Sequence, residues 1–303
     1  MAPYVVDAGD RLWFSRCRRS WDWSALARQA LEPAGNRVAQ AEPGRGLRDA
    51  LAVHYFPGMW SWDRAIVAPL VVAAFERAGG SNDVRPVLDA FQQWAPESDQ
   101  FTPVRVEADL EVHVPDPDHP DQHLATAGGA AVRYRDRVAL LMVDDGDRHW
   151  IGDHRVVTRF TPADLLALDP RTATACWAWE EMELGAPIVG TQYTEIRLDP
   201  PEFRRTAVER STQDKQRAAT RLGRAVRDML DPALTIDATP DWSHCSECGF
   251  RCPCLAMERG EDVSALLTAG YQARSADVIE EGRLGGVSWG LGRGAAPPRF
   301  DKH

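Results

Sequence analysis

Hydrophobic and polar residues alternate along three neighbouring segments in the middle of the chain. Such alternation is typical of a strand that buries one face and exposes the other. The second and third segments are separated by Asp144-Asp145-Gly146-Asp147, which predicts the turn of a hairpin. A fourth apolar segment is expected to end near Pro200-Pro201. The predicted strands are residues 104–114, 131–143, 149–157 and 186–198.

Segments on both sides of these strands repeat their apolar residues every three or four positions, as an amphipathic helix does. One helical stretch is interrupted at Pro57-Gly58, because proline and glycine break the repeat. The last helix contains Ser211 and Asp214 at the spacing of a capping box, so its regular part is expected to start there. Residues 33–45 are predicted to form a loop. The predicted helices are residues 10–31, 47–54, 62–78, 81–100, 161–185 and 204–230.

The composition limits the class of protein without identifying one. The chain has 303 residues, 44% of them hydrophobic, which supports a core, and a net charge of −10. That charge argues against a protein that coats nucleic acid, although a local basic groove is compatible with it. No apolar run reaches the length of a membrane span, and the N-terminus has no apolar signal core, so a cytoplasmic protein without membrane contact is expected. One domain is expected over 1–275, followed by a flexible tail rich in Gly and Pro over 276–303.

Cysteines give the clearest chemical indication in the chain, because four of the six lie in the ten residues CSECGFRCPC. Thiolates this close together are typical of a zinc ion or an iron–sulfur cluster, and a chain of this length needs no disulfides. A zinc site would use Cys245, Cys248, Cys252 and Cys254. However, one residue between Cys252 and Cys254 is a tight spacing for two ligands of one tetrahedral ion. The alternative set omits Cys252 and takes its fourth ligand from Cys17.

A lone N-terminal cysteine followed by C-x2-C-x5-C resembles the iron–sulfur RecB-type nucleases of the PD-(D/E)XK superfamily. These include the AddB subunit of bacterial helicase–nucleases and the CRISPR-associated and phage RecB-like exonucleases. The resemblance covers about residues 10–270. It implies an α/β fold with a restriction-endonuclease-like core, in which helices flank a mixed β-sheet. It also implies that Cys17, Cys245, Cys248 and Cys254 hold a 4Fe-4S cluster that joins the N- and C-terminal segments, with zinc as the alternative cofactor.

The two metal-binding motifs of that family are only partly present. In the family one strand ends in a metal-binding Asp, and the next carries W-x-x-D/E-x-K, whose lysine orients the attacking water. Here YRDRVALLMV places Ala139 at the Asp position. WIGDHR keeps the second carboxylate as Asp153 but has Arg155 in place of the lysine. Arginine is a poor replacement, because it is bulkier and binds in a planar fork.

Two further family motifs are also replaced. The His of a G-x-x-x-H motif is replaced by Arg48, which cannot bind Mg²⁺ because it has no acceptor atom. A Q-x-x-x-Y motif aligns with Arg171 and Ala175. His54 is expected to lie in the core or to be half-buried, and Cys176 is expected to be buried in its helix. With one carboxylate left, the motifs predict a catalytically degenerate member of the family.

The expected function is therefore that of a DNA-binding or structural subunit in DNA repair, recombination or defence. Its expected partners are single-stranded or duplex DNA and a helicase or other protein subunit. Arg217, Arg221 and Arg224 lie on one face of the last predicted helix and are the candidate DNA contacts, with a solvated surface as the alternative.

Two other functions stay open. One is a divergent Mg²⁺-dependent DNA exonuclease, which rebuilds its metal site from Glu107, Asp109 and Asp153. Asp109 is farther from Asp153 in sequence than the family spacing, which argues against this alternative. The other is a redox sensor that uses the iron–sulfur cluster as a switch.

Overall fold

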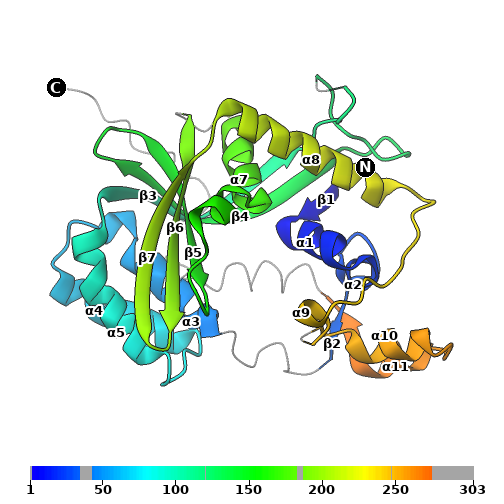
Figure 1. The fold of residues 1–303 in the computed structure, drawn as a ribbon, viewed down its shortest axis with the longest axis horizontal. Coiled ribbons are helices and arrows are strands. Elements are labelled where there is room, and N and C mark those ends of the chain that lie inside the picture. The colour runs from blue at the N-terminus through cyan, green and yellow to red at the C-terminus, as the bar shows by residue number, and fades with distance from the viewer. Residues whose placement is uncertain (1, 35–42, 120, 183–186, 247, 275–303) are drawn as a thin grey trace.

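The structure is a computed structural model that describes residues 2–34, 43–119, 121–182, 187–246 and 248–274. These residues form a mixed β-sheet with helices on both faces, and a smaller two-stranded sheet (Figure 1). The expected mixed α/β architecture is thereby confirmed. The flexible tail expected at 276–303 lies outside the described residues.

The main sheet consists of β1 (Tyr4–Asp7), β3 (Phe101–His113), β4 (Val132–Asp144), β5 (His149–Val156), β6 (Ile188–Leu198) and β7 (Pro201–Glu209). β4 pairs with three other strands, and β3 runs antiparallel along one of its edges. Along its other edge, β1 runs parallel to the first part of β4 and β5 runs antiparallel to the last part. β6 is parallel to β5, and β7 returns antiparallel to β6. The four predicted strands correspond to β3, β4, β5 and β6.

The helices are α1 (Ala8–Arg16), α2 (Arg18–Ser24), α3 (Pro43–His54), the 3-10 helix η1 (Pro57–Met59), α4 (Arg64–Arg77), α5 (Arg85–Ser98), α6 (Ala163–Ala167), α7 (Pro170–Glu181), α8 (Thr212–Leu230), α9 (Trp242–Cys245), α10 (Arg251–Glu258) and α11 (Ser264–Gly270). α1, α7 and α8 pack on one face of the sheet, and α3, α4 and α5 pack on the other. Each face has its own hydrophobic core. In the described segments, no helix combines the length and apolar character that crossing a bilayer requires.

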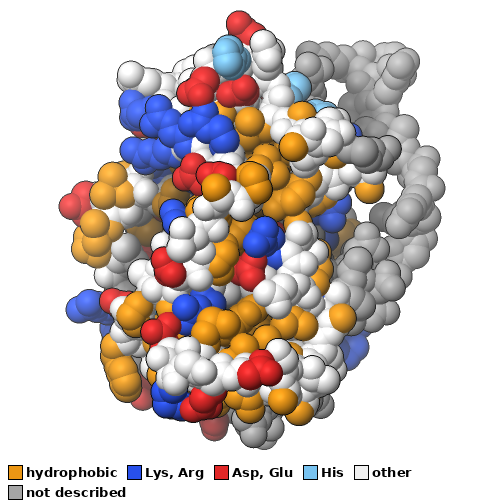
Figure 2. Space-filling view, turned by 90° about the vertical axis from the view of Figure 1, so that its right-hand side faces the viewer, with side chains coloured by type: hydrophobic (Ala, Val, Ile, Leu, Met, Phe, Trp, Pro, Cys, Tyr) orange, Lys and Arg blue, Asp and Glu red, His pale blue; other side chains and the backbone are white. Residues whose placement is uncertain are grey.

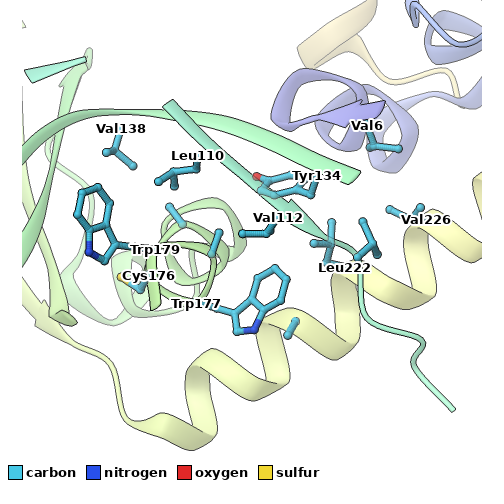
Figure 3. Packing of buried hydrophobic residues seen from close by; sticks show 14 of the residues in the cluster. Val6, Leu110, Val112, Tyr134, Val138, Cys176, Trp177, Trp179, Leu222 and Val226 are labelled. Atoms are coloured by element: carbon cyan, nitrogen blue, oxygen red, sulfur yellow. The ribbon is translucent and has the colours of Figure 1, made fainter. Parts of the chain in front are cut away.

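Figure 3 shows the core on the α7 and α8 face. Tyr134 and Val138 of β4 point into it, and Trp177 of α7 and Leu222 of α8 meet them from the helices. Fully burying side chains of this size stabilises a fold by about 1.5–3 kcal/mol each. This core therefore holds α7 firmly against β4 and β5. Cys176 is also buried there, as expected.

Three predicted helices differ from the structure. The helix expected at 161–185 is divided into α6 and α7, because Asp169 caps a new helix that begins at Pro170. The helix expected at 10–31 is interrupted at Cys17, whose backbone is extended (φ −158°, ψ 110°), so α1 and α2 are separate. Residues 204–209, expected to begin the long helix, instead pair with β6 as part of β7, because the sheet ladder satisfies their backbone groups. α8 begins after Ser211, whose hydroxyl accepts a hydrogen bond from the Asp214 amide at 3.1 Å. The capping box was thus the better indicator.

The N-terminal and C-terminal segments pack against each other. β2 (Leu31–Pro33) and β8 (Tyr271–Ala273) form the small antiparallel sheet. The ring of Phe250 lies between Trp23 and Tyr271, with centroid distances of 5.5 and 5.1 Å. Residues at the two ends of the described chain are therefore neighbours around α2 and α10.

Candidate functional site

Two aspartates from neighbouring strands meet beneath the start of α7. Asp136 of β4 and Asp153 of β5 line one small cavity, together with Arg171 and Thr172 of α7. The cavity measures about 10 Å³, which is room for about one water molecule. Because α7 begins at Pro170, its first turn lies directly over these carboxylates. The site is therefore built by strand pairing below and by a helix N-terminus above.

The guanidinium of Arg171 joins the two aspartates. Its Nη2 donates to Oδ1 of Asp136 at 3.2 Å, and its Nη1 donates to Oδ1 of Asp153 at 3.4 Å. Nη2 also donates to the carbonyl oxygen of Arg137 at 2.9 Å. A cation thus sits between the two carboxylates, and it belongs to the protein.

A second arginine completes the network from the other side. Arg155 donates from Nε to Oδ2 of Asp153 and from Nη2 to Oδ2 of Asp169. Asp169 is the N-cap of α7, and its Oδ1 accepts from the amide of Arg171 at 2.8 Å. The arginine that stands in the lysine position is therefore held by two carboxylates, so its side chain is not free to orient a water.

Burial sets the electrostatics of the site. Only 4% of the Asp136 side chain is exposed, against 49% of Arg171. Burial raises the pKa of Asp136, and Arg171 partly offsets this. Burial would lower the pKa of Arg171, but Asp136 and Asp153 raise it above its ordinary value. The arginine therefore stays charged and offsets part of the negative charge of the two aspartates.

The carboxylate oxygens in this site already have protein donors. On Asp136, Oδ1 also accepts from the amide of Arg137 at 2.8 Å, and Oδ2 accepts from the hydroxyl of Tyr134 at 3.2 Å. Mg²⁺ requires about six oxygen ligands at roughly 2.0–2.1 Å, which a carboxylate engaged by guanidinium groups supplies poorly. Across the described ranges, no group of three or more His, Cys, Asp or Glu side chains is placed to hold a metal ion.

The other acidic candidates lie apart from this network. Asp109 is 61% exposed and forms a two-pronged ion pair with Arg137, at 2.7 and 3.0 Å. Glu107 is half-buried, and burial raises its pKa to about 6, although Arg137 and Arg48 act against this. Arg48, at the family's His position, is exposed, and its charge acts on Glu107. The structure thus pairs Asp153 with Asp136, a partner that sequence reasoning did not select.

Asp136 could have been found from its position in the strand. It lies two residues from both Tyr134 and Val138, which face the core, so strand alternation directs it inward. An ionisable residue in such a position is rarely fully buried without a partner. That partner, Arg171, could not be read from local pattern, because it lies 35 residues away.

The cysteines predicted to bind a cofactor lie in the region where the two chain ends meet. Cys17 is buried at the junction of α1 and α2. Its neighbours on α2 reach the C-terminal thiols. Arg19 donates to the sulfur of Cys254 at 3.5 Å, and the hydroxyl of Ser20 lies 3.9 Å from the sulfur of Cys248. Burial raises the pKa of Cys248, and the charges of Cys17 and Cys245 raise it further.

The remaining thiols differ in their surroundings. The sulfur of Cys245 accepts from the amide of Asp241 at 3.4 Å. Cys252, which belongs only to the zinc set, is exposed on α10. Cys176 lies far away in the core, with its sulfur 3.5 Å from the hydroxyl of Thr191. All six cysteines are free thiols, so none forms a disulfide in the structure.

The arginines predicted to contact DNA lie on the outer side of α8. Arg217, Arg221 and Arg224 are all exposed. Arg217 forms an ion pair with Asp214, one turn earlier on the same helix. Lys and Arg side chains gather in one patch over α8, in the upper left of Figure 2.

Comparison with known proteins gives no family assignment. No family model matches the chain, and no curated protein matches it either. Among the solved structures that are similar, one described as the crystal structure of SSO0001 matches over 84% of this chain and 88% of its own. Its sequence identity is 9% and its TM-score is 0.39, which is too low to bear on function.

Proposed function

We propose that this protein is a catalytically silent, nuclease-like protein that works as a DNA-binding or structural subunit. The observation that carries this proposal is the position of Arg171, whose guanidinium lies between Asp136 and Asp153. In the family that the sequence resembles, a divalent ion between such carboxylates polarises the phosphate and generates hydroxide. A guanidinium in that place supplies one positive charge instead of two, and it cannot coordinate a water and lower its pKa as a metal ion does.

The replacement of the lysine has a similar consequence. Arg155 is engaged by Asp153 and Asp169, so its donors are directed into the protein. The arginines and aspartates form a chain of ion pairs that is complete without a ligand. Such a chain stabilises the packing of α7 on β4 and β5, which suits a fold retained for binding or assembly.

A cleavage assay tests this proposal directly. Purified full-length protein, prepared without oxygen and supplied with iron, is incubated with single-stranded and duplex DNA in Mg²⁺ or Mn²⁺. We expect no cleavage above that of Asp153→Ala. Cleavage by the wild type that disappears in Asp153→Ala would overturn the proposal and favour the divergent exonuclease.

A metal-binding measurement tests the role assigned to Arg171. Removing this guanidinium leaves Asp136 and Asp153 facing each other, so Arg171→Ala should gain Mn²⁺ binding, detected by electron paramagnetic resonance. Arg159→Ala is the matched control, because Arg159 is exposed and lies outside the network. Equal Mn²⁺ binding by the wild type and Arg171→Ala would show that the arginine does not exclude the ion.

The cysteine site completes the proposed function as a structural element. The sequence resemblance is what assigns Cys17, Cys245, Cys248 and Cys254 to an iron–sulfur cluster. In support, α2 residues reach the sulfurs of Cys248 and Cys254, although the described thiols are not grouped as a metal site in the structure. A single zinc ion needs its sulfurs roughly 3.8 Å apart, given Zn–S bonds of about 2.3 Å. A cluster of four irons spreads its ligands more widely. When bound, it would link α2 to α9 and α10.

Paired cysteine variants separate the cluster from zinc. Cys17→Ser should lose bound iron and sulfide and lower the melting temperature, whereas Cys252→Ser should leave both unchanged, because Cys252 is exposed. Metal content is measured by mass spectrometry and labile sulfide by colorimetry. Zinc retained by Cys17→Ser and lost from Cys252→Ser would instead establish the local zinc site.

A further inference from the structure

The exposed side of α8 is basic, although the protein as a whole is acidic. Between Lys215 and Arg227 the helix contains no Asp or Glu, although the whole chain carries a net charge of −10. Arg217, Arg221 and Arg224 project from this side, and we refer to these three residues as the α8 ridge. The opposite side is apolar and packs on the sheet. The ridge is therefore a surface feature that packing does not require.

Two members of the ridge have no partner in the described chain. Arg221 and Arg224 are exposed and form neither an ion pair nor a side-chain hydrogen bond with another described residue. Each guanidinium therefore offers five N–H donors to a ligand. Arg217 is already paired with Asp214, but that pair is exposed on both sides and is easily exchanged.

The ridge continues toward the candidate site through Arg11 of α1. This residue is half-buried, and its Nη1 donates to the hydroxyl of Thr174 at 2.6 Å and to the carbonyl oxygen of Pro170 at 3.5 Å. Burial lowers its pKa, and the charge of Arg221 lowers it further, whereas Tyr134 and Asp136 act in the opposite direction. Arg11 is thus within electrostatic range of both the ridge and the site.

We infer that the α8 ridge binds the sugar–phosphate backbone of a nucleic acid, which then runs past Arg11 toward the mouth of the candidate site. This inference rests on the DNA-binding form of the proposed function. The ridge rises about 10.5 Å from Arg217 to Arg224, the axial length of about three base pairs at 3.4 Å each. Three arginines along that length can each meet a phosphate.

The chemistry of the ridge favours nucleic acid over an acidic protein. Protein interfaces depend on buried aromatic and aliphatic anchors, with charges at the rim. Among the described residues, the large exposed hydrophobic side chains lie on other elements, and α8 carries none of them. Non-specific binding to phosphates needs only basic side chains and does not require such anchors.

The test compares two triple variants with the same change in net charge. One is Arg217→Gln, Arg221→Gln and Arg224→Gln. The control is Arg77→Gln, Arg105→Gln and Arg159→Gln, three exposed arginines that form no ion pair within the described chain. Glutamine keeps a helix propensity close to that of arginine, so the fold should be preserved in both. Circular dichroism checks this.

Binding of labelled duplex and single-stranded DNA is measured with EDTA present, over a series of salt concentrations. Losing three phosphate contacts should reduce the slope of log K against log salt by about 2–3, and weaken binding at least tenfold at low salt. The control should keep the wild-type slope. An equal loss in the control, or no binding by the wild type, would overturn the inference.

The outcome remains separable from that of the proposed function. If the wild type cleaves DNA and only the ridge variant loses DNA binding, the proposal of a catalytically silent protein is wrong. The inference that the α8 ridge binds DNA is then still supported. If the wild type neither cleaves nor binds DNA, the inference about the α8 ridge is wrong. The proposed function then holds only as a catalytically silent structural subunit.

Discussion

On both faces of the sheet, arginine side chains form ion pairs with aspartates, but the two groups of ion pairs differ in how deeply they are buried. On the α7 face, Arg171 bridges Asp136 and Asp153 and is 49% exposed. On the α3–α5 face, Arg205 of β7 pairs with Asp99, and these side chains are 10% and 2% exposed. The first network opens to solvent at a small cavity. The second is sealed, so only the first can meet a ligand.

The sealed network includes aromatic rings as well as charges. The hydroxyl of Tyr55 donates to Asp99 at 3.2 Å, and Arg205 donates to that hydroxyl at 3.0 Å. His154 of β5 stacks on Tyr55, with centroids 5.4 Å apart. Burial raises the pKa of Asp99, and Arg205 opposes this. A buried group of this kind costs much when it loses one member and little when it is replaced as a whole.

Among the single substitutions, the largest effect is expected for Arg205→Met. This change leaves Asp99 buried without its cation, which should lower the free energy of unfolding by about 3–5 kcal/mol. Urea denaturation followed by circular dichroism measures it. The double variant Arg205→Met with Asp99→Leu removes both charges and should recover much of the loss. If Arg205→Met lowered the free energy of unfolding no more than Arg171→Gln does, the two networks would not differ in the way proposed.

The next prediction is a loss of folding stability at acidic pH, which arises from histidines on the sealed α3–α5 face. Burial, with Arg64 acting on His54 and Arg205 on His154, lowers the pKa of both histidines from 6.5 to about 3. The unfolded chain therefore takes up their protons first. Stability is full above about pH 6.5 and falls as the pH drops toward 3, by up to about 1.4 kcal/mol per pH unit for each histidine.

The pH dependence can be assigned with two variants. His154→Asn should remove about half of the histidine slope, whereas His119→Asn, at an exposed position, should leave it unchanged. Glu107, whose pKa is raised to about 6, contributes the opposite slope between about pH 4.5 and 6. The net slope is therefore expected to be steepest below pH 4.5. An identical profile in His154→Asn would rule out this histidine as a source.

The smallest effect is expected for Arg171→Gln, at about 1 kcal/mol. Solvent can replace the half-exposed guanidinium, and a cation in the first turn of a helix is unfavourable to the helix dipole, which offsets part of the loss. Thermal denaturation measures the change, with Arg159→Gln as the exposed control. A loss of several kcal/mol would mean that the open network is chiefly structural, like the sealed one.

Local pattern was enough for much of the fold. Alternation located the strands, the Asp144–Asp147 turn closed the hairpin, and Ser211 with Asp214 located the start of α8. These features depend on residues within a few positions of one another, so one segment of sequence contains the whole cause. The same holds for the burial of Cys176, which follows from its apolar helix.

Tertiary structure decided the candidate site. Asp136 acquires its role only when β4 and β5 pair and α7 places Arg171 over them, and Arg171 lies 35 residues from Asp136 in sequence. Likewise, β7 is a strand because β6 offers it a ladder, although residues 204–209 were predicted to begin the long helix. Sequence alone determined which side chains were available. Their charges became partners because folding placed them within hydrogen-bonding distance in a region that excludes most water.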